Sequence, residues 1–413
     1  MRKNGVNKQI IPVEGGVCAP AGFKANGIRC GCGISRKSVS RETNDCFLRE
    51  DLALILADKR CPVACTYAQG TLRGATAEVT KKHIRLGYAR AIIANSGVAN
   101  VFGEKATAMA QEICALLAKH ANVSTDEIVI ASTGAIGEKF DNAPILSGIP
   151  KLVSELAATE ENSLAAARAL MTTDRWAKQA AFSFELGAFP CKIGAIFKGN
   201  ARVCPNMATT LCFLTTDVNI TPEMLQKALH YAVDETFNMM NVDGVSSPND
   251  TVCVMASGLA GNCQINAPDS EYAKFVFALK EVLARICRTI VEDGAENGLI
   301  FECRAKGAKS QRMAKSIART IVGASAIKDS LKNGEIDAQS VLCAIHSTGE
   351  AFGIEKLEIS FCSEKGQVVV FDEGTVIETS KNVLDTIFSG ENVALLVDLH
   401  AGNYSATAIG CVR

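Results

Sequence analysis

The sequence predicts an α+β or layered α/β fold, with mixed sheets packed against helices, and not a doubly wound parallel sheet. Short strand-like apolar runs and amphipathic helical stretches occur along the whole chain, but they do not alternate as regular strand–helix–strand units. No GxGxxG or P-loop sequence follows a predicted strand, so no motif supports a nucleotide-binding sheet.

The composition is that of a protein with a sizeable core. The chain has 413 residues, of which 48% are hydrophobic and 21% charged, and its formal net charge is −1. This length suits two or three domains or one large α/β body. Because no basic block is present, nothing indicates nucleic acid or an anionic membrane as a partner. The polar start and the lack of an apolar run of about 20 residues predict a cytoplasmic protein.

The first half of the chain contains predicted strands at 52–56 and 91–94. A helix is expected over 105–120, because apolar residues recur there at helical spacing. The stripe consists of Ala106, Met109, Ile113, Leu116 and Leu117. The apolar run that begins at Ile128 predicts a strand ending near Thr133-Gly134, where a turn presents a hydroxyl and backbone N–H groups. An ordinary strand-to-loop turn explains the same residues.

A helix over 163–170 is followed by Met171–Asp174, which could be a polar cluster at a pocket rim or a helix terminus. Taken in isolation, the segment is interpreted as a helix terminus. In the second half, Thr221 and Pro222 predict a helix start, since Thr is a good N-cap and Pro suits the first helical position. This helix runs to about residue 239.

The residues 238–252 are dense in Asn, Asp, Ser and Gly and predict a tight turn. Further helices are expected over 271–290 and 309–322. Short strands are predicted near the end of the chain, at 358–362 and 368–371.

Seventeen cysteines are scattered along the chain, and the close pairs are Cys30 with Cys32 and Cys61 with Cys65. No two CxxC pairs occur and no histidine has zinc-finger spacing, so we expect no structural zinc site. Most of the cysteines have apolar neighbours in the sequence, which favours small buried hydrophobes.

The stretch from Lys198 to Asp217 places an Ala208-Thr209 bond after a Pro-Asn turn and before an apolar run. A threonine held there can attack the preceding carbonyl, exchange the amide for an ester and release its own α-amine. That amine has a pKa of about 7.7–8.0 in peptides, so it can accept the hydroxyl proton near neutral pH. When this segment is read alone, a threonine-rich strand after a turn is the favoured interpretation.

Together with motifs elsewhere, this segment resembles the ornithine acetyltransferase (glutamate N-acetyltransferase) family of arginine biosynthesis. The most specific match is Asn206–Thr209, followed by an apolar strand and Thr215–Asp217. The other matching segments cover nearly the whole chain: Gly15–Ile28, Asp51–Ile55, Asn95–Asn100, Ser132–Gly137, Met171–Asp174, Lys198-Gly199, Val242–Gly244, Asn249–Val252 and Ser405–Ala408.

The resemblance implies a layered fold of the α-β-β-α type with a central pair of sheets. It also implies self-cleavage before Thr209 into an alpha fragment, 1–208, and a beta fragment, 209–413. The fragments stay together, and two such pairs commonly assemble. The new N-terminal Thr209 takes an acetyl group from N-acetylornithine and passes it to glutamate. No cofactor or metal is expected, and some members also use acetyl-CoA as a substrate.

The resemblance also assigns site residues. Thr133 and Gly134 match the oxyanion-hole pair, and Thr172 and Lys198 match positions that contact the substrate. An ammonium group beside the nucleophile can hold a substrate carboxylate and favour the free amine of Thr209.

Three departures from the family pattern lie near substrate recognition. Asn200-Ala201-Arg202 replaces a usual Ser-Gly-Met, and the substrate-binding Glu position falls on Ala295, with Glu296 one step away. The sequence given also ends shortly after Ser405–Cys411, where members usually continue to an Asn-containing tail. We therefore expect the acyl-transfer machinery to be conventional and the substrate pocket to differ.

Two alternatives remain open from the sequence. A related N-terminal-nucleophile amidase or aminopeptidase would use the same threonine and oxyanion hole, with water as the acyl acceptor. A diverged paralogue would fold and cleave itself but have an altered substrate or no activity.

Overall fold

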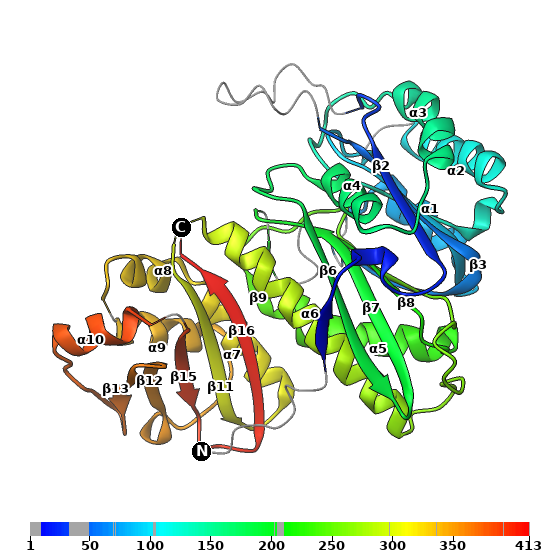
Figure 1. The fold of residues 1–413 in the computed structure, drawn as a ribbon. Helices are drawn as coiled ribbons and strands as arrows, with labels where there is room; N and C mark the ends of the chain where they lie inside the picture. Colours follow the sequence, from blue (N-terminus) through cyan, green and yellow to red (C-terminus); the bar gives the residue numbers. More distant parts are fainter. Residues whose placement is uncertain are drawn as a thin grey trace. The chain divides into compact units, whose positions relative to one another are not determined.

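The computed structural model describes residues 10–32, 49–68, 70, 72–101, 105–201, 203–204, 210–296, 298–335, 337–390 and 392–412. The chain forms two compact units (Figure 1). The first unit comprises 1–199, 209–233 and 247–286, and the second comprises 200–208, 234–246 and 287–413. Each unit is built on one mixed sheet, which confirms the predicted layered α/β class.

The first unit has a nine-stranded sheet in the order β1-β6-β7-β8-β10-β3-β4-β5, with β2 paired to β3. The strands are β1 (Ile11–Val13), β2 (Phe23–Ile28), β3 (Leu52–Tyr67), β4 (Tyr88–Asn95), β5 (Ile128–Ser132), β6 (Lys178–Leu186), β7 (Phe189–Lys198), β8 (Leu211–Thr216) and β10 (Thr251–Ala256). The pairs β4–β5 and β8–β10 are parallel and the other pairs are antiparallel, so the sheet is not doubly wound.

Strand β3 is much longer than the strand predicted at 52–56. The register against β4 shifts between Leu56 and Cys61, and the strand then continues to Tyr67, where it pairs with β10. The polar residues at 58–60 are exposed, and they break the apolar pattern on which the prediction rested.

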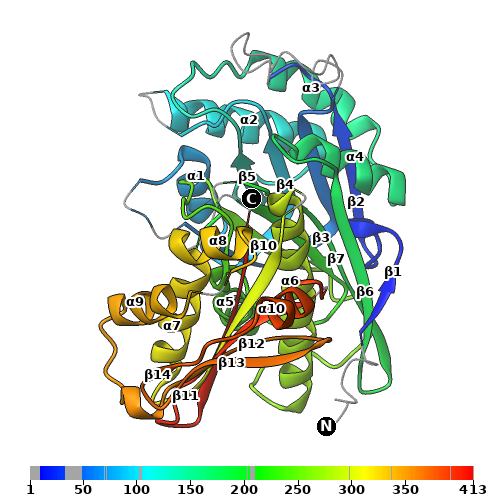
Figure 2. The ribbon, with the colours of Figure 1, turned by 90° about the vertical axis from the view of Figure 1, so that its left-hand side faces the viewer.

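Helices cover both faces of the β3–β4–β5 part of this sheet (Figure 2). Since neighbouring strand residues point to opposite faces, Ile93 and Ile130 pack among α1 (Ala75–His83), α2 (Ala106–Ala121) and α3 (Ala143–Ser154). Ile92 and Val129 pack on the other face, with α4 (Glu160–Leu170). The helices α2 and α4 confirm those predicted over 105–120 and 163–170.

The second unit contains the sheet β14-β13-β12-β15-β11-β16-β9. The strands are β9 (Met240–Asn241), β11 (Ile300–Ala308), β12 (Glu358–Ser363), β13 (Gly366–Asp372), β14 (Thr375–Val376), β15 (Val393–Asp398) and β16 (Tyr404–Cys411). Its core includes the apolar face of α7 (Gln311–Gly323), which packs on β11 and β16. The predicted strands at 358–362 and 368–371 and the helix at 309–322 are therefore confirmed.

The remaining helices are α5 (Pro222–Glu235), α6 (Ser270–Ala295), α8 (Ser325–Lys332), α9 (Ala338–Ser347) and α10 (Lys381–Phe388). Helix α5 begins at the predicted proline, and a short 3-10 turn over Phe237–Met239 follows it. Helix α6 confirms the one predicted over 271–290, whereas the sequence analysis anticipated none of α8, α9 and α10.

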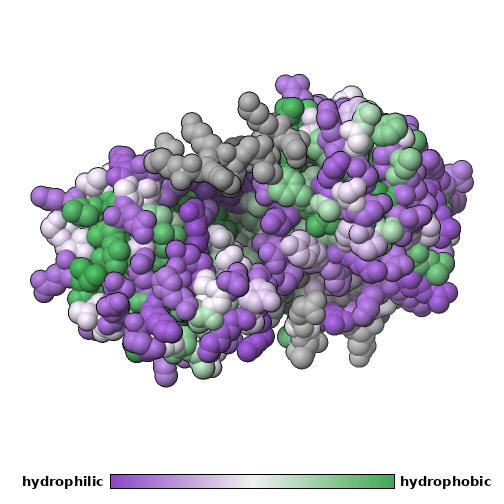
Figure 3. All heavy atoms as spheres, turned by 90° about the horizontal axis from the view of Figure 1, so that it is seen from below, coloured by the Kyte–Doolittle hydropathy of each residue, from purple (hydrophilic) through white to green (hydrophobic). Residues whose placement is uncertain are grey.

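The surface seen in Figure 3 is mostly hydrophilic, and apolar side chains gather on it in separate patches. Val376, Ile377 and Val383 are among the exposed apolar side chains of the second unit. Among the helices that the structure describes, none has the length and apolar character needed to cross a membrane.

Candidate active site

Thr133 and Gly134 lie in the loop after β5, in the first unit. The N–H of Thr133 donates to the carbonyl of Asn95 over 2.9 Å, and the N–H of Ala135 donates to the carbonyl of Gly97 over 2.9 Å. These bonds extend the parallel β4–β5 pairing and hold the loop against the end of β4. The backbone N–H groups of Thr133 and Ala135 are occupied by these hydrogen bonds. The Thr133 hydroxyl and the Gly134 N–H lie between them in the sequence and are the donors that we consider for a ligand.

Gly134 is required by both conformation and space. Its φ is +134°, and an added Cβ would lie 2.1 Å from the carbonyl oxygen of Gly97. Gly137, three residues later, also has a positive φ of +84°, but an added Cβ there would meet nothing within 4 Å. Both glycines therefore have a positive φ, but only at Gly134 would an added Cβ clash with a neighbouring atom.

We expect Gly134→Ala to lower the free energy of unfolding by clearly more than Gly137→Ala, whose cost is the positive φ alone, about 1–3 kcal/mol. The additional loss of stability in Gly134→Ala arises because the Gly97 carbonyl must move away from the new Cβ. This movement weakens the hydrogen bond that the carbonyl accepts from the Ala135 N–H. Urea unfolding of both variants measures the difference. Equal losses would show that the loop relaxes freely and that its geometry is not fixed by this contact.

Lys198, the last residue of β7, brings two hydroxyl groups together. Its ammonium donates to Thr172 Oγ1 over 2.7 Å and to Thr133 Oγ1 over 3.4 Å. The lysine is 4% exposed and Thr133 is 5% exposed, and Thr172 is partly exposed, so the three side chains form a largely buried polar cluster. The structure thus brings together three of the residues that the resemblance assigns to the site.

Asp174 is the carboxylate of this cluster. Its Oδ1 accepts from the Lys178 ammonium and from the Gly199 N–H, each over 2.7 Å, and its Oδ2 accepts from the Thr172 N–H over 3.0 Å. The Lys198 ammonium lies 4.0 Å from Oδ2. Burial alone would raise the pKa of Asp174, but Lys198, Lys178 and the N–H donors outweigh it and hold the pKa below its usual value.

The segment 171–174 is therefore more than the helix terminus that we predicted. It does follow the end of α4 at Leu170, but Asp174 is buried and organises both Thr172 and the end of β7. The segment 171–174 does not include Lys178, which is the first residue of β6 and lies four residues after Asp174. Its contact with Asp174 was therefore not predicted from this segment.

The start of β8 lies beside the end of β7, because Lys198 and Leu211 are cross-strand partners. Thr210, which is bonded to Thr209, donates its N–H to Asp250 Oδ1 over 2.8 Å and accepts from the Thr251 N–H over 3.0 Å. Asp250 also accepts the Ser247 N–H over 3.3 Å. Its carboxyl therefore ties the residue that follows Thr209 to the loop before β10.

The sequence predicted a tight turn over residues 238–252, with Asn249–Val252 among the segments that match the family, but it indicated no contact between Asp250 and Thr210. The carboxyl is 1% exposed. Burial raises its pKa well above the usual value, although the Thr210 and Ser247 N–H groups and Lys198 act in the opposite direction.

This raised pKa gives a pH dependence with a definite sign. Folded Asp250 keeps its proton to a higher pH than the unfolded chain, so above about pH 4 the unfolded state has fewer bound protons at this site. The free energy of unfolding should therefore fall with rising pH, by at most about 1.4 kcal/mol per pH unit from this group. We expect Asp250→Asn to gain stability relative to wild type as pH rises from 4, as measured by urea unfolding at several pH values. If the stability difference between Asp250→Asn and wild type did not change with pH, the pKa of Asp250 would not be raised in the folded state.

The remaining proposed site residues are Ala208, Thr209 and Glu296. Ala208 and Thr209 lie outside the described residues. Glu296 belongs to the second unit, where it is exposed at the end of α6 with a φ of +59°, while the neighbouring Ala295 is buried. The proposed roles of these residues stay predictions.

The described cysteines agree with the expectation of small buried hydrophobes for most positions. Burial raises the pKa of the Cys61, Cys114 and Cys191 thiols to about 12, so these thiols are protonated at neutral pH. They are poor nucleophiles for that reason.

Comparison with known proteins identifies close relatives over the whole chain. The profile of the ArgJ family matches residues 38–412. The arginine biosynthesis bifunctional protein ArgJ of Symbiobacterium thermophilum is 34% identical, over 97% of this chain and 96% of that protein. The bifunctional protein ArgJ 1 of Clostridium acetobutylicum is 32% identical, over 94% and 92%. The glutamate N-acetyltransferase of Methanocaldococcus jannaschii is 33% identical, over 97% and 96%.

Solved structures with detectable likeness include two with related sequences. The bifunctional protein ArgJ of Bacillus halodurans is 31% identical with a TM-score of 0.46, over 49% of this chain and 93% of that one. The ornithine acetyltransferase of Mycobacterium tuberculosis, solved with ornithine, is 27% identical with a TM-score of 0.37, over 42% and 88%.

Proposed function

This chain belongs to the ArgJ family, and on that premise we propose that it is an acetyltransferase of arginine biosynthesis that moves an acetyl group from N-acetylornithine to glutamate. The observation that carries the proposal is the buried Lys198 ammonium, which binds Thr133 and Thr172 beside the first residues of β8. A cation and two hydroxyl groups therefore lie at the end of β7 that pairs with Leu211, two residues after Thr209 in the sequence.

The proposed reaction has two half-reactions at Thr209. Its α-amine takes the hydroxyl proton while the oxygen attacks the acetyl carbonyl of N-acetylornithine. The tetrahedral oxyanion collapses, the C–N bond breaks, and ornithine leaves with the proton. Glutamate then attacks the acetyl-Thr209 ester with its neutral amine, and the threonine oxygen leaves and regains a proton. The α-amine of Thr209 acts as base and then as acid in each half-reaction.

The Thr133 hydroxyl and the Gly134 N–H are proposed to stabilise the oxyanion. A preorganised donor of this kind typically contributes on the order of 100–1000-fold in rate. The Asn95 and Gly97 carbonyls hold the loop before the substrate arrives, so little rearrangement is needed when negative charge develops.

Lys198 is proposed to hold the substrate carboxylate. The ammonium groups of Lys198 and Lys178 lie 4.0 Å and 2.7 Å from oxygens of the Asp174 carboxylate, so positive charge is concentrated at this buried position. A substrate carboxylate would be attracted to that charge. The same positive charge favours the neutral form of a nearby α-amine, which is the form that acts as base.

We also propose that the chain cleaves itself between Ala208 and Thr209, giving fragments 1–208 and 209–413. In the first unit, β7 and β3 belong to the fragment before that bond, and β8 and β10 belong to the fragment after it. In the sheet, β8 and β10 lie between β7 and β3. The β7–β8 and β10–β3 ladders join the two fragments through backbone hydrogen bonds. Hydrolysis of one peptide bond would therefore leave the fragments associated.

Several finer points rest on the resemblance alone. We propose an assembly of two alpha and two beta chains, a cytoplasmic location, acetyl-CoA as an alternative acetyl donor, and a substrate contact by Glu296. Three of the proteins named above are called bifunctional and one is called glutamate N-acetyltransferase. Acetyl-CoA use is the feature that we expect to distinguish such enzymes.

An acetyl-transfer assay separates the proposal from its alternatives. The purified chain is incubated with N-acetylornithine and glutamate, and N-acetylglutamate is measured; acetyl-CoA replaces N-acetylornithine in a parallel reaction. We expect N-acetylglutamate and ornithine in equal amounts. Acetate released without glutamate would support the amidase alternative. A chain that is cleaved and folded but inactive with both donors would support the diverged paralogue.

A further inference from the structure

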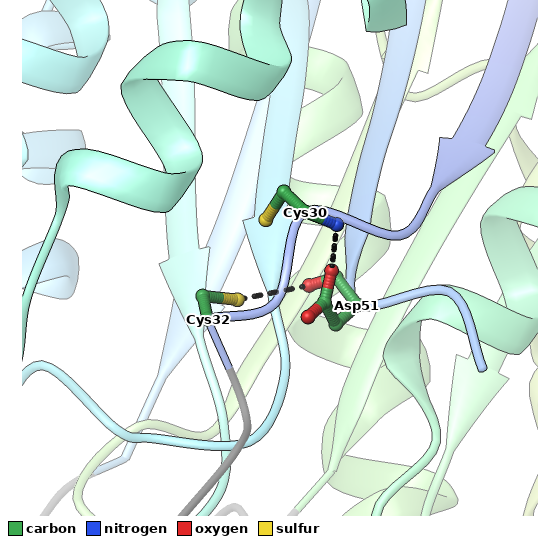
Figure 4. Close-up of side chains that lie close together, drawn as sticks. All are labelled: Cys30, Cys32 and Asp51. Carbon is green, nitrogen blue, oxygen red and sulfur yellow. Dashed lines mark hydrogen bonds between the residues drawn. The ribbon is translucent and has the colours of Figure 1, made fainter. Parts of the chain in front are cut away.

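Two cysteines and one aspartate meet at one edge of the first-unit sheet, outside the cluster around Lys198 (Figure 4). Cys30 and Cys32 follow the end of β2, and Asp51 precedes the start of β3. Their ligand atoms, the two Sγ atoms and a carboxylate oxygen, all lie within 4.8 Å of one another. Cys32 and Asp51 are buried, and Cys30 is partly exposed.

The backbone holds this group in place. The Asp51 carboxylate accepts the Cys30 N–H over 2.6 Å and the Gly31 N–H over 2.8 Å, and Gly31 has a φ of +88° that allows the tight turn between the cysteines. The Asp51 N–H donates to the carbonyl of Ile28 over 2.9 Å. The end of β2 and the start of β3 thus form one rigid corner that presents both thiols beside the carboxylate.

Among the described residues, no cationic side chain compensates the charge of Asp51 in this corner. Asp51 is 8% exposed, and among the described lysine, arginine and histidine side chains none forms an ion pair with it. Each carboxylate oxygen that accepts one N–H retains a second lone pair. A buried carboxylate in this condition is stabilised by a bound cation.

We propose that Cys30, Cys32 and Asp51 form a binding site for a divalent cation that prefers sulfur ligands, with Zn²⁺ as its occupant. Two thiolates and a carboxylate are ligands that zinc accepts, whereas Mg²⁺ and Ca²⁺ prefer oxygen ligands alone. Zinc–sulfur bonds are about 2.3 Å long, so tetrahedral ligand atoms lie roughly 3.8 Å apart. Rotation of the two cysteine side chains closes the remaining gap.

Binding displaces the two thiol protons, and water completes the tetrahedron on the partly exposed side of Cys30. The sequence expectation of no zinc site rested on the absence of paired CxxC motifs. It missed this group because the carboxylate lies 19 residues beyond Cys32 in the chain and approaches the thiols only through β2–β3 pairing.

The corner also contacts the loop that supports Thr133. The Cys32 thiol donates to the Ser96 carbonyl over 3.3 Å and to the Asp51 carbonyl over 3.5 Å. Ser96 lies between Asn95 and Gly97, whose carbonyls hold the Thr133–Ala135 loop. Zinc binding removes the thiol proton and so removes the Cys32–Ser96 hydrogen bond, within one residue of the contacts that fix this loop.

Metal titration of the full chain tests the site. The reduced protein is freed of metal, titrated with Zn²⁺ against a chromophoric chelator, and titrated separately with Co²⁺. We expect one Zn²⁺ per chain with a dissociation constant below about 1 μM, and a thiolate-to-cobalt charge-transfer band. Cys30→Ser and Cys32→Ser should each weaken Zn²⁺ binding at least about 100-fold, since loss of a metal ligand costs more affinity than loss of a group that only orients a ligand.

Cys343→Ser removes an exposed thiol of the second unit and is the matched control, with binding expected to be unchanged. Wild-type affinity in the Cys30→Ser/Cys32→Ser double variant, with its fold verified by circular dichroism, overturns the site. A charge-transfer band that is lost in Cys343→Ser instead overturns it as well. None of these measurements requires turnover, so they stand independently of the proposed acetyl transfer.

Discussion

Thr209→Ala should abolish both self-cleavage and acetyl transfer. Denaturing electrophoresis of wild type should show two fragments of about 22 kDa, because Ala208-Thr209 lies near the middle of a 43.7 kDa chain, whereas the variant should stay at full mass. Transfer from N-acetylornithine to glutamate should fall on the order of 10⁴-fold or more, since both the nucleophile and its base are lost.

Thr210→Ala is the matched control for this variant. The Thr210 hydroxyl is buried and has no hydrogen-bond partner among the described residues, while the backbone N–H donates the hydrogen bond to Asp250. Removal of that hydroxyl should change the free energy of unfolding by less than about 1 kcal/mol. Cleavage and transfer should both persist in Thr210→Ala. Loss of cleavage in Thr210→Ala and its retention in Thr209→Ala would move the nucleophile by one residue.

The sequence predicted secondary structure best where periodicity and end signals agreed. Helix α2 has both a clear apolar stripe and a defined end, and α5 starts at the proline that predicts it. The full length of β3 was not predicted, because three exposed polar residues interrupt the apolar pattern inside one continuous strand. Such an interruption looks like a loop unless the partners of the strand are known.

The candidate site divides in a similar way. Thr133, Thr172 and Lys198 came from motif resemblance, and the structure places their side chains in contact. Asp250 could not be assigned from sequence, because its partner Thr210 is 40 residues away and is reached only through the parallel pairing of β8 with β10. Such long-range contacts leave no local pattern of residues, so motif reading cannot detect them.

Asp174→Ala should cost the most stability of the changes considered. The substitution leaves the ammonium groups of Lys178 and Lys198, which are 2% and 4% exposed, without their shared carboxylate. The N–H groups of Thr172 and Gly199 lose their acceptor as well. Removing one partner from a buried ionic network typically costs about 3–5 kcal/mol, and urea unfolding at pH 7 should show a loss of that size.

The charge origin of this loss can be separated from the cavity that the variant creates. The double variant Asp174→Ala/Lys178→Met lacks the ammonium group that contacts Asp174 in wild type. If charge causes the loss, the double variant should be more stable than Asp174→Ala. If the cavity causes it, the double variant should remain as unstable as Asp174→Ala. The pH dependence gives a second check. Because the folded pKa of Asp174 lies below its unfolded value, its stabilisation is present above about pH 4 and is lost as pH falls further.

The advantage of wild type over Asp174→Asn should therefore shrink in acid, in the opposite sense to the effect of Asp250. These opposite signs follow from one physical difference. Both carboxyls are buried, but Asp174 has an ammonium in contact, whereas Asp250 has only backbone donors and a more distant lysine. If both variants gave the same pH trend, burial alone would determine the two pKa values and the lysine contacts of Asp174 would carry no weight.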